Sequence, residues 1–238
     1  MRSLQTFLVI CLALALAACG TGDDAVQAPP QDATANPEPT EVSQESETAE
    51  AEFLVVFLGD SLTAGFGLDV EQSYPALVES QLRERGWSVR AVNAGISGDT
   101  TAGGLRRLDW LLRQNPDVLM VALGGNDGLR GVDLESSESH LRQILQKAQE
   151  QGVQVLLAGM LIPPNYGADY TEQFASLYPR LAEEFEVPLI PFLLEGVAAQ
   201  PELNLPDGIH PTAEGQEIVA ATVLRHLEPV LEGLRPAP

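Results

Sequence analysis

A serine in a short polar turn is the first residue of this chain whose position could support chemistry. Residues 53–58 form an apolar run typical of a buried strand, and the turn after Gly59 presents Ser61. The carboxyl ends of parallel strands form the edge where α/β proteins bind their ligands. A serine hydroxyl is a weak nucleophile until a base takes its proton. A nucleophilic Ser61 therefore requires a histidine, a carboxylate and oxyanion donors elsewhere in the chain.

The chain has only three histidines that could act as the base. His140 and His226 lie within helical patterns, whereas His210 lies in a loop bounded by prolines, three residues after Asp207. In such a loop the carboxylate can accept from one ring nitrogen, while the other nitrogen takes a proton from Ser61. The chain order serine, aspartate, histidine is one known order for a triad. In the alternative interpretation, the aspartate only forms a turn and the histidine only caps the next helix.

Two further segments could supply oxyanion donors. Gly98 follows a short strand expected at 88–92 and lies just before a helix, so its amide could point outward as a donor. Asn126 lies at the polar tip after an apolar run at 118–123, and its side-chain amide could also bind an oxyanion. The alternatives are that the residues after Gly98 only cap a helix and that Asn126 is only a turn residue.

Taken together, these segments resemble the SGNH hydrolases, also called the GDSL family. The matching blocks are Gly-Asp-Ser-Leu at 59–62, the stretch 93–100, Gly-Gly-Asn-Asp at 124–127 and Asp-Gly-Ile-His-Pro at 207–211. Within the family, the chain is most similar to small bacterial multifunctional esterases of the thioesterase I, lysophospholipase L1 or arylesterase type. That similarity rests on the segments 97–100, 124–131 and 164–167, and it spans about 53–231.

The resemblance implies a serine esterase that acts on aryl and short-to-medium acyl esters, with thioesters and lysophospholipids as further substrates. Ser61 would attack the acyl carbonyl, and His210 would act as general base and then as general acid. Asp207 would orient His210, and the backbone amides of Ser61 and Gly98 would hold the oxyanion with the side chain of Asn126. Three further aspartates in these blocks are expected to brace their loops, with no role in the chemistry: Asp60, Asp99 and Asp127.

The acyl pocket is expected in the segments 128–133 and 160–166, which offer apolar side chains after the third and fourth strands. In the resembling esterases the corresponding loops contact the acyl chain. We hypothesise that Leu129 and Ile162 touch it; the alternative is that both pack only against the fold.

The elements that position these residues read as a single α/β domain at 53–238. Strand-like runs at 53–58, 88–92, 118–123, 153–158 and 188–191 alternate with helical patterns at 73–86, 101–114, 134–151, 169–186 and 213–231. This alternation predicts a parallel sheet covered on both faces. The resemblance implies a three-layer α/β/α sandwich, flavodoxin-like, with five parallel strands in the order 2-1-3-4-5.

The N-terminal segment predicts export. Residues 1–18 have the form of a secretory signal, and Leu-Ala-Ala-Cys-Gly at 16–20 resembles a bacterial lipoprotein signal box, in which Cys19 would be lipidated. The alternative is an ordinary cleavage site that precedes a cysteine. Residues 19–52 carry nine acidic residues and no basic ones, so we expect a disordered acidic tether. The predicted location is the cell envelope, on a membrane facing the periplasm or exterior, with the outer membrane favoured by Gly20.

The net charge and the cysteine content limit which partners and which chemistry the protein can have. The net charge is −21, and about −13 of it lies on 53–238, which argues against nucleic acid as a partner. The only cysteines are Cys11 and Cys19, so the domain has neither a thiol nucleophile nor a disulfide. We expect no cofactor and no metal, a monomer, a small acyl ester as substrate and a membrane contact through the lipid.

Three alternative functions remain at this stage. One is a deacetylase of envelope sugars or glycans with the same triad, mildly disfavoured by the apolar segment 160–162. Another is a non-catalytic lipoprotein that binds lipid, which the intact set of catalytic residues opposes. The third is flavodoxin-like cofactor binding, but the sequence has no glycine loop of the kind that cradles phosphate.

Overall fold

The computed structural model describes residues 51–235. The signal peptide expected at 1–18, the lipidation at Cys19 and nearly all of the tether expected at 19–52 lie outside the described residues.

Five parallel strands form one sheet in the order β2-β1-β3-β4-β5. The strands are β1 (Phe53–Gly59), β2 (Val89–Gly95), β3 (Val118–Ala122), β4 (Gln154–Ala158) and β5 (Leu189–Ile190). The predicted α/β fold and strand order are confirmed. All of β3 and most of β1 are buried, which explains why both read as continuous apolar runs instead of alternating patterns.

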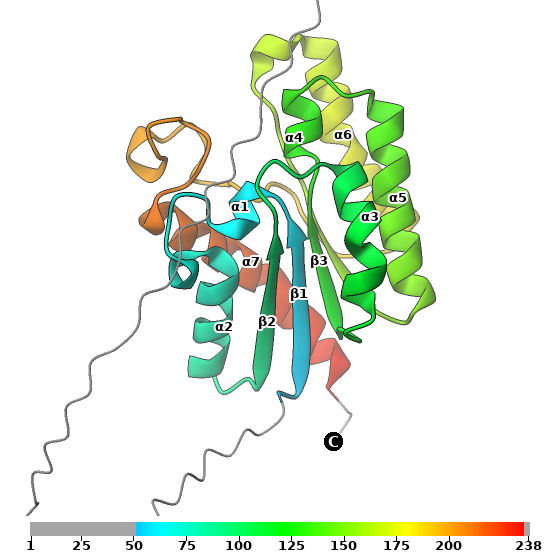
Figure 1. The fold of residues 1–238 in the computed structure, drawn as a ribbon, viewed down its shortest axis with the longest axis vertical. Helices are drawn as coiled ribbons and strands as arrows, with labels where there is room; N and C mark the ends of the chain where they lie inside the picture. The colour runs from blue at the N-terminus through cyan, green and yellow to red at the C-terminus, as the bar shows by residue number, and fades with distance from the viewer. Residues whose placement is uncertain (1–50, 236–238) are drawn as a thin grey trace, which may run out of the picture. The chain divides into compact units, whose positions relative to one another are not determined.

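Helices cover both faces of the sheet and complete three layers (Figure 1). On one face α2 (Tyr74–Glu84) packs against α7 (Ala213–Leu234). On the other face α5 (Leu134–Glu150) packs against both α3 (Thr101–Leu112) and α6 (Ala168–Glu184). The short helices α1 (Ser61–Ala64) and α4 (Gly125–Leu129) follow β1 and β3 directly at the carboxyl edge (Figure 1). Short 3-10 turns lie at Val70–Gln72, Pro164–Tyr166 and Pro201–Leu203.

Strand β2 differs from the prediction, which ended it at residue 92. The strand continues to Gly95 and pairs with the last residues of β1, up to Gly59. Its polar end is compatible with a strand because Asn93 donates through Nδ2 to the carbonyl of Thr63 and accepts at Oδ1 from the amide of Gly95. The side chain that reads as a loop residue thus joins β2 to α1.

A glycine terminates helix α2. Gly86 follows α2 with φ 84°, and Trp87 N donates to the carbonyl of Leu82 while Gly86 N donates to that of Arg83. These two bonds form a Schellman motif, which requires the left-handed conformation that glycine adopts without strain. Within residues 51–235, no helix has the length and apolar character needed to cross a membrane.

Candidate active site

The turn between β1 and α1 holds Ser61 at the carboxyl edge of the sheet. Asp60 caps α1 by accepting at Oδ1 from the amide of Leu62 at 3.0 Å, and Gly65 ends the helix with φ 73°. Asp60 is buried, so this cap is shielded from water. The Ser61 hydroxyl is therefore presented from the first turn of a helix fixed at both ends.

Ser61, His210 and Asp207 form a continuous relay. Ser61 Oγ lies 2.8 Å from His210 Nε2, and His210 Nδ1 lies 2.7 Å from Asp207 Oδ2. A carboxylate can only accept, so Nδ1 carries a proton and Nε2 of the neutral ring is the acceptor for the serine hydroxyl. This is the tautomer that a general base requires.

The other oxygen of Asp207 is also engaged. Asp207 Oδ1 accepts from the amides of Ile209 at 2.9 Å and His210 at 3.0 Å. The amide and imidazole of His210, together with the amide of Ile209, lower the pKa of the Asp207 carboxyl to about 2. The carboxylate therefore stays ionised at any pH where the imidazole could act as a base.

The loop that carries this pair is fixed to its surroundings. Leu205 N donates to the carbonyl of His210 at 2.7 Å, and Gly208 turns the chain with φ 69°. The buried Asn204 donates through Nδ2 to the carbonyls of Val197 and Gln200. Asp207 and His210 thus lie on a turn that these hydrogen bonds fix, and their role is more than that of a turn and a helix cap.

The residues predicted to bind the oxyanion lie around a hollow next to Ser61. It has a volume of about 270 Å³, and its lining includes Ser61, Gly98, Asn126 and His210. Gly98 has φ 79°, a left-handed conformation that glycine adopts readily. Arg130 donates to the carbonyl of Gly98 at 3.0 Å and approaches Asn126 Oδ1 at 3.4 Å, so it joins the two loops. Donation by these groups to an oxyanion stays a prediction.

Asp60 connects the nucleophile turn to the expected oxyanion amide. Its Oδ2 accepts from Asn126 Nδ2 at 3.1 Å. Burial raises the pKa of the Asp60 carboxyl to about 6, although the amide of Leu62 and the side chain of Asn126 oppose the rise. Asp60 therefore braces a side-chain donor as well as a backbone amide.

The other two aspartates tie the oxyanion loops to helices. The buried Asp127 accepts from the amide and the hydroxyl of Thr101, at 2.9 and 2.6 Å. Asp99 accepts from the amide of Thr100 and from Arg107 Nε at 2.8 Å. The loop-bracing role expected for these side chains agrees with their contacts.

The two expected acyl-pocket residues lie in different environments. Leu129 lines the hollow beside Asn126. Ile162 is only 7% exposed and packs against Gly128. It is not among the described residues that line the hollow. A contact of either residue with an acyl chain stays a prediction.

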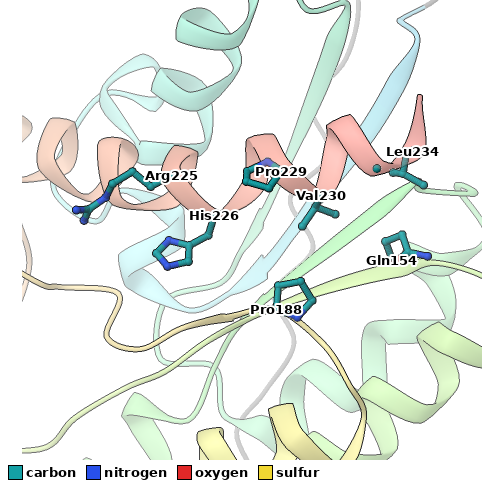
Figure 2. A pocket seen from close by; sticks show the side chains of 8 residues that line it. Gln154, Pro188, Arg225, His226, Pro229, Val230 and Leu234 are labelled. Atoms are coloured by element: carbon teal, nitrogen blue, oxygen red, sulfur yellow. The ribbon is translucent and has the colours of Figure 1, made fainter. Parts of the chain in front are cut away.

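The remaining histidines serve other contacts. His140 Nδ1 lies 3.2 Å from the hydroxyl of Thr101. His226 Nδ1 donates to the carbonyl of Thr222 and faces a larger hollow of about 450 Å³, at the amino ends of β4 and β5 (Figure 2). The described lining of that hollow contains neither a hydroxyl nor a carboxylate. It is larger than the hollow at Ser61 but has no groups for a second relay.

Sequence reasoning missed three side chains at the site: Phe66, Arg107 and Arg130. Phe66 stacks on His210 with ring centroids 4.4 Å apart and planes 36° apart. An aromatic residue between two glycines, five positions after the nucleophile, was a usable signal for an exposed turn. Arg107 gave no signal, because only the fold reveals which carbonyls its guanidinium reaches.

A serine–histidine–aspartate relay at the carboxyl edge of a parallel sheet is the arrangement of a serine hydrolase. The model of the GDSL-like lipase/acylhydrolase family matches residues 57–218. The chain therefore belongs to the GDSL-like lipase/acylhydrolase family, and the family predicted from the motifs is confirmed.

Characterised relatives agree with this assignment. The chain is 41% identical over 187 residues to an arylesterase of Vibrio mimicus, which covers 76% of this chain and 94% of that protein. It is 42% identical over 178 residues to thioesterase 1/protease 1/lysophospholipase L1 of Escherichia coli (strain K12), covering 74% and 84% respectively. The crystal structure of TesA matches with a TM-score of 0.72 at 42% identity, over 74% of this chain and 99% of that one. The psychrotrophic esterase EstA from Pseudoalteromonas sp. matches with a TM-score of 0.73 at 31% identity, over 76% and 100%.

Proposed function

We propose that this protein is a serine esterase that hydrolyses carboxylic esters through an acyl-enzyme formed on Ser61. The observation that carries the proposal is the relay from Ser61 Oγ through His210 to Asp207, with contacts of 2.8 and 2.7 Å. Family membership supports the same activity.

The relay assigns each proton. Ser61 Oγ attacks the ester carbonyl while its proton passes to His210 Nε2, and Asp207 stabilises the imidazolium that results. The carbonyl oxygen becomes an oxyanion, for which the amides of Ser61 and Gly98 and the side chain of Asn126 are the proposed donors. Collapse breaks the bond to the leaving oxygen, which takes the proton from Nε2. Water then attacks the acyl-enzyme in the same way, with His210 Nε2 as the base, and the carboxylic acid is released from Ser61.

The proposed substrates are aryl and short-to-medium acyl esters, with thioesters and lysophospholipids as further members. The small hollow at Ser61 has mostly apolar walls, including Leu62, Phe66, Leu129 and Ile209. Apolar walls favour hydrocarbon acyl and leaving groups over hydrated sugars. The arylesterase and thioesterase names of the relatives point to the same range.

Hydrolysis of 4-nitrophenyl esters from acetate to palmitate, by the full chain and by Ser61→Ala, tests the proposal. We expect activity at short to medium chain length and its loss in the variant. Activity on acetate alone would favour a deacetylase. A folded chain that hydrolyses none of these esters would leave lipid binding as the better explanation.

We also propose that the protein is a lipoprotein of the outer membrane, anchored through Cys19. The support is the signal-like segment 1–18, the box around Cys19 and Gly20 as the next residue. Mass spectrometry of the N-terminal peptide should find two or more acyl chains on Cys19, and Cys19→Ala should leave the membrane fraction. An unmodified N-terminal peptide would contradict the anchor.

A further inference from the structure

The walls of the hollow beside His210 differ from the walls beside Asn126. Phe66 stacks on His210, and Ile209, its neighbour in the chain, lines the same hollow; both side chains are large, apolar and 47% and 46% exposed. Leu129 also lines the hollow, from the same short helix as Asn126. The two sides face different parts of an ester, because the histidine and the oxyanion donors contact different oxygens.

The mechanism fixes which part of the ester meets Phe66. His210 Nε2 must return its proton to the leaving oxygen, so that oxygen lies within hydrogen-bond distance of the ring. The substituent on the leaving oxygen then extends over the groups that flank the imidazole. These groups are Phe66, whose ring is 4.4 Å from that of His210, and the adjacent Ile209.

The backbone holds Phe66 in place before any substrate arrives. Its amide donates to the carbonyl of Ser61 at 3.1 Å. The flanking Gly65 and Gly67 have φ 73° and 80°, which turn the chain sharply on both sides of the ring. At Gly67 the chain passes so near Leu205 that a Cβ would lie 2.9 Å from its Cδ1, so the Phe66 turn packs against the histidine loop. A half-exposed aromatic ring fixed in this way suits a binding surface.

We propose that Phe66 and Ile209 form a leaving-group subsite that selects aromatic and other apolar alcohols. The inference rests on the proposed esterase function and adds the residues that contact and select the leaving group. An aromatic leaving group would lie against Phe66 in an offset or edge contact, whereas a short aliphatic alcohol would leave the ring untouched. One such aromatic pair corresponds to about a 2- to 12-fold effect on a rate or binding constant.

The test compares phenyl acetate with ethyl acetate in the wild type, Phe66→Ala and Phe66→Tyr. The two esters form the same acetyl-enzyme and differ only in the leaving group. Each effect is taken as the ratio of wild-type to variant kcat/KM, which cancels the intrinsic reactivity of the ester. We expect Phe66→Ala to lower kcat/KM about 5-fold or more for phenyl acetate and less than about 2-fold for ethyl acetate. Phe66→Tyr keeps the ring and should keep the preference, and Ile209→Ala should reduce it in the same direction.

The breakdown of the acetyl-enzyme supplies the decisive control. No leaving group is present in that step, so Phe66→Ala should change its single-turnover rate no more than it changes kcat/KM for ethyl acetate, less than about 2-fold. Trp110→Ala, which truncates an exposed aromatic ring outside the lining of the hollow, should change neither ester.

Each outcome separates the subsite from the esterase function. An equal loss on both esters, together with slower acetyl-enzyme breakdown, would show that Phe66 only supports the imidazole and would overturn the subsite. Unchanged kinetics on both esters in Phe66→Ala and Ile209→Ala would also overturn it. In either case Ser61-dependent hydrolysis would still support the esterase, whereas its absence in the wild type would remove the basis of both proposals.

Discussion

Asp60 Oδ2 accepts a hydrogen bond from Asn126 Nδ2 at 3.1 Å, so the residue before the nucleophile fixes the amide expected to face the oxyanion. The other oxygen of Asp60 accepts from the amide of Leu62. Arg130 approaches Asn126 Oδ1 from the opposite side, at 3.4 Å. The orientation of the Asn126 amide is therefore set by an acceptor on one end and a donor on the other.

Replacing Asp60 with asparagine should misorient Asn126. Both carboxylate oxygens of Asp60 face donors, and an asparagine would place an amide NH₂ against one of them. Losing one oxyanion donor typically lowers kcat by about 10²–10³-fold, and we expect Asp60→Asn to approach this with little change in KM. Steady-state kinetics on a 4-nitrophenyl ester would measure it. Asp169→Asn changes an exposed aspartate on α6 and serves as the control. An ordinary surface change is expected to alter kcat by about 3-fold or less. A kcat for Asp60→Asn within about 3-fold of wild type would therefore reject this positioning role.

The same carboxyl should make stability depend on pH. Burial raises the pKa of Asp60 from 3.8 to about 6, so between these values the folded protein holds a proton that the unfolded chain has lost. The contribution of Asp60 to the free energy of unfolding is then greatest below pH 4, declines as the pH rises to about 6 and stays constant above it. The expected change is about 3 kcal/mol.

Urea denaturation from pH 4 to 8 would measure this effect as the difference between wild type and Asp60→Asn. The side chains around Asp60 are the same in both proteins, so contributions that do not involve Asp60 cancel in this difference. A difference that does not vary with pH would contradict the raised pKa.

The resemblance to the SGNH hydrolases implied the sheet order and the position of the His210 loop. The strand-end positions of Ser61, Gly98 and Asn126 predicted that these three residues meet, because parallel strands end at a common edge. The motifs could not predict the end of β2, since Asn93 reads as a loop residue until its bonds to Thr63 and Gly95 are known. The network behind the site was equally inaccessible. Two of the three acceptors of Arg107 are backbone carbonyls, 13 and 48 residues away in the chain, and no local pattern encodes them.

Arg107 should support both stability and activity. Its guanidinium donates to Asp99 and to the carbonyls of Ala94 and Gly59, at 2.8, 2.6 and 2.8 Å. These groups lie at the ends of β1 and β2 and in the Gly98 loop, and a lysine cannot reach all three with one ammonium. We expect Arg107→Lys to lower the free energy of unfolding by about 2 kcal/mol, because partly buried acceptors lose their donors.

Thermal and urea denaturation would measure the loss, and Arg106→Lys provides a matched control on the exposed side of the same helix. The turnover number should fall as well, since Asp99 is next to Gly98. Equal stability of the two lysine variants would show that the three bonds contribute little.

Asp207→Asn should remove most activity while leaving the fold intact. The exposed Asp207 accepts from His210 Nδ1, and an asparagine that donates to the ring would favour the tautomer whose Nε2 carries the proton. Nε2 could then no longer accept from Ser61, and the expected loss in kcat is up to about 10⁴-fold. A circular dichroism spectrum would verify folding. A loss smaller than 10-fold, well below the 10²–10⁴-fold typical of a general base, would show that the carboxylate does not set the tautomer.

Gly95→Ala should separate Ser61 from His210 without altering either residue. A Cβ at Gly95 would overlap the backbone of Ala64, the last residue of the helix that begins with Ser61. Backbone cannot rotate aside as a side chain can, so α1 must shift away from β2. A displacement near 1 Å would break the 2.8 Å contact between Ser61 Oγ and His210 Nε2 and lower kcat about 10²-fold. The overpacking should also lower the free energy of unfolding by about 1–3 kcal/mol. Gly233→Ala adds the same methyl group near the end of α7, where nothing lies within 4 Å of the new Cβ, and should leave activity unchanged. If Gly95→Ala hydrolyses esters as fast as Gly233→Ala, then the close approach of β2 and α1 does not set the position of the nucleophile.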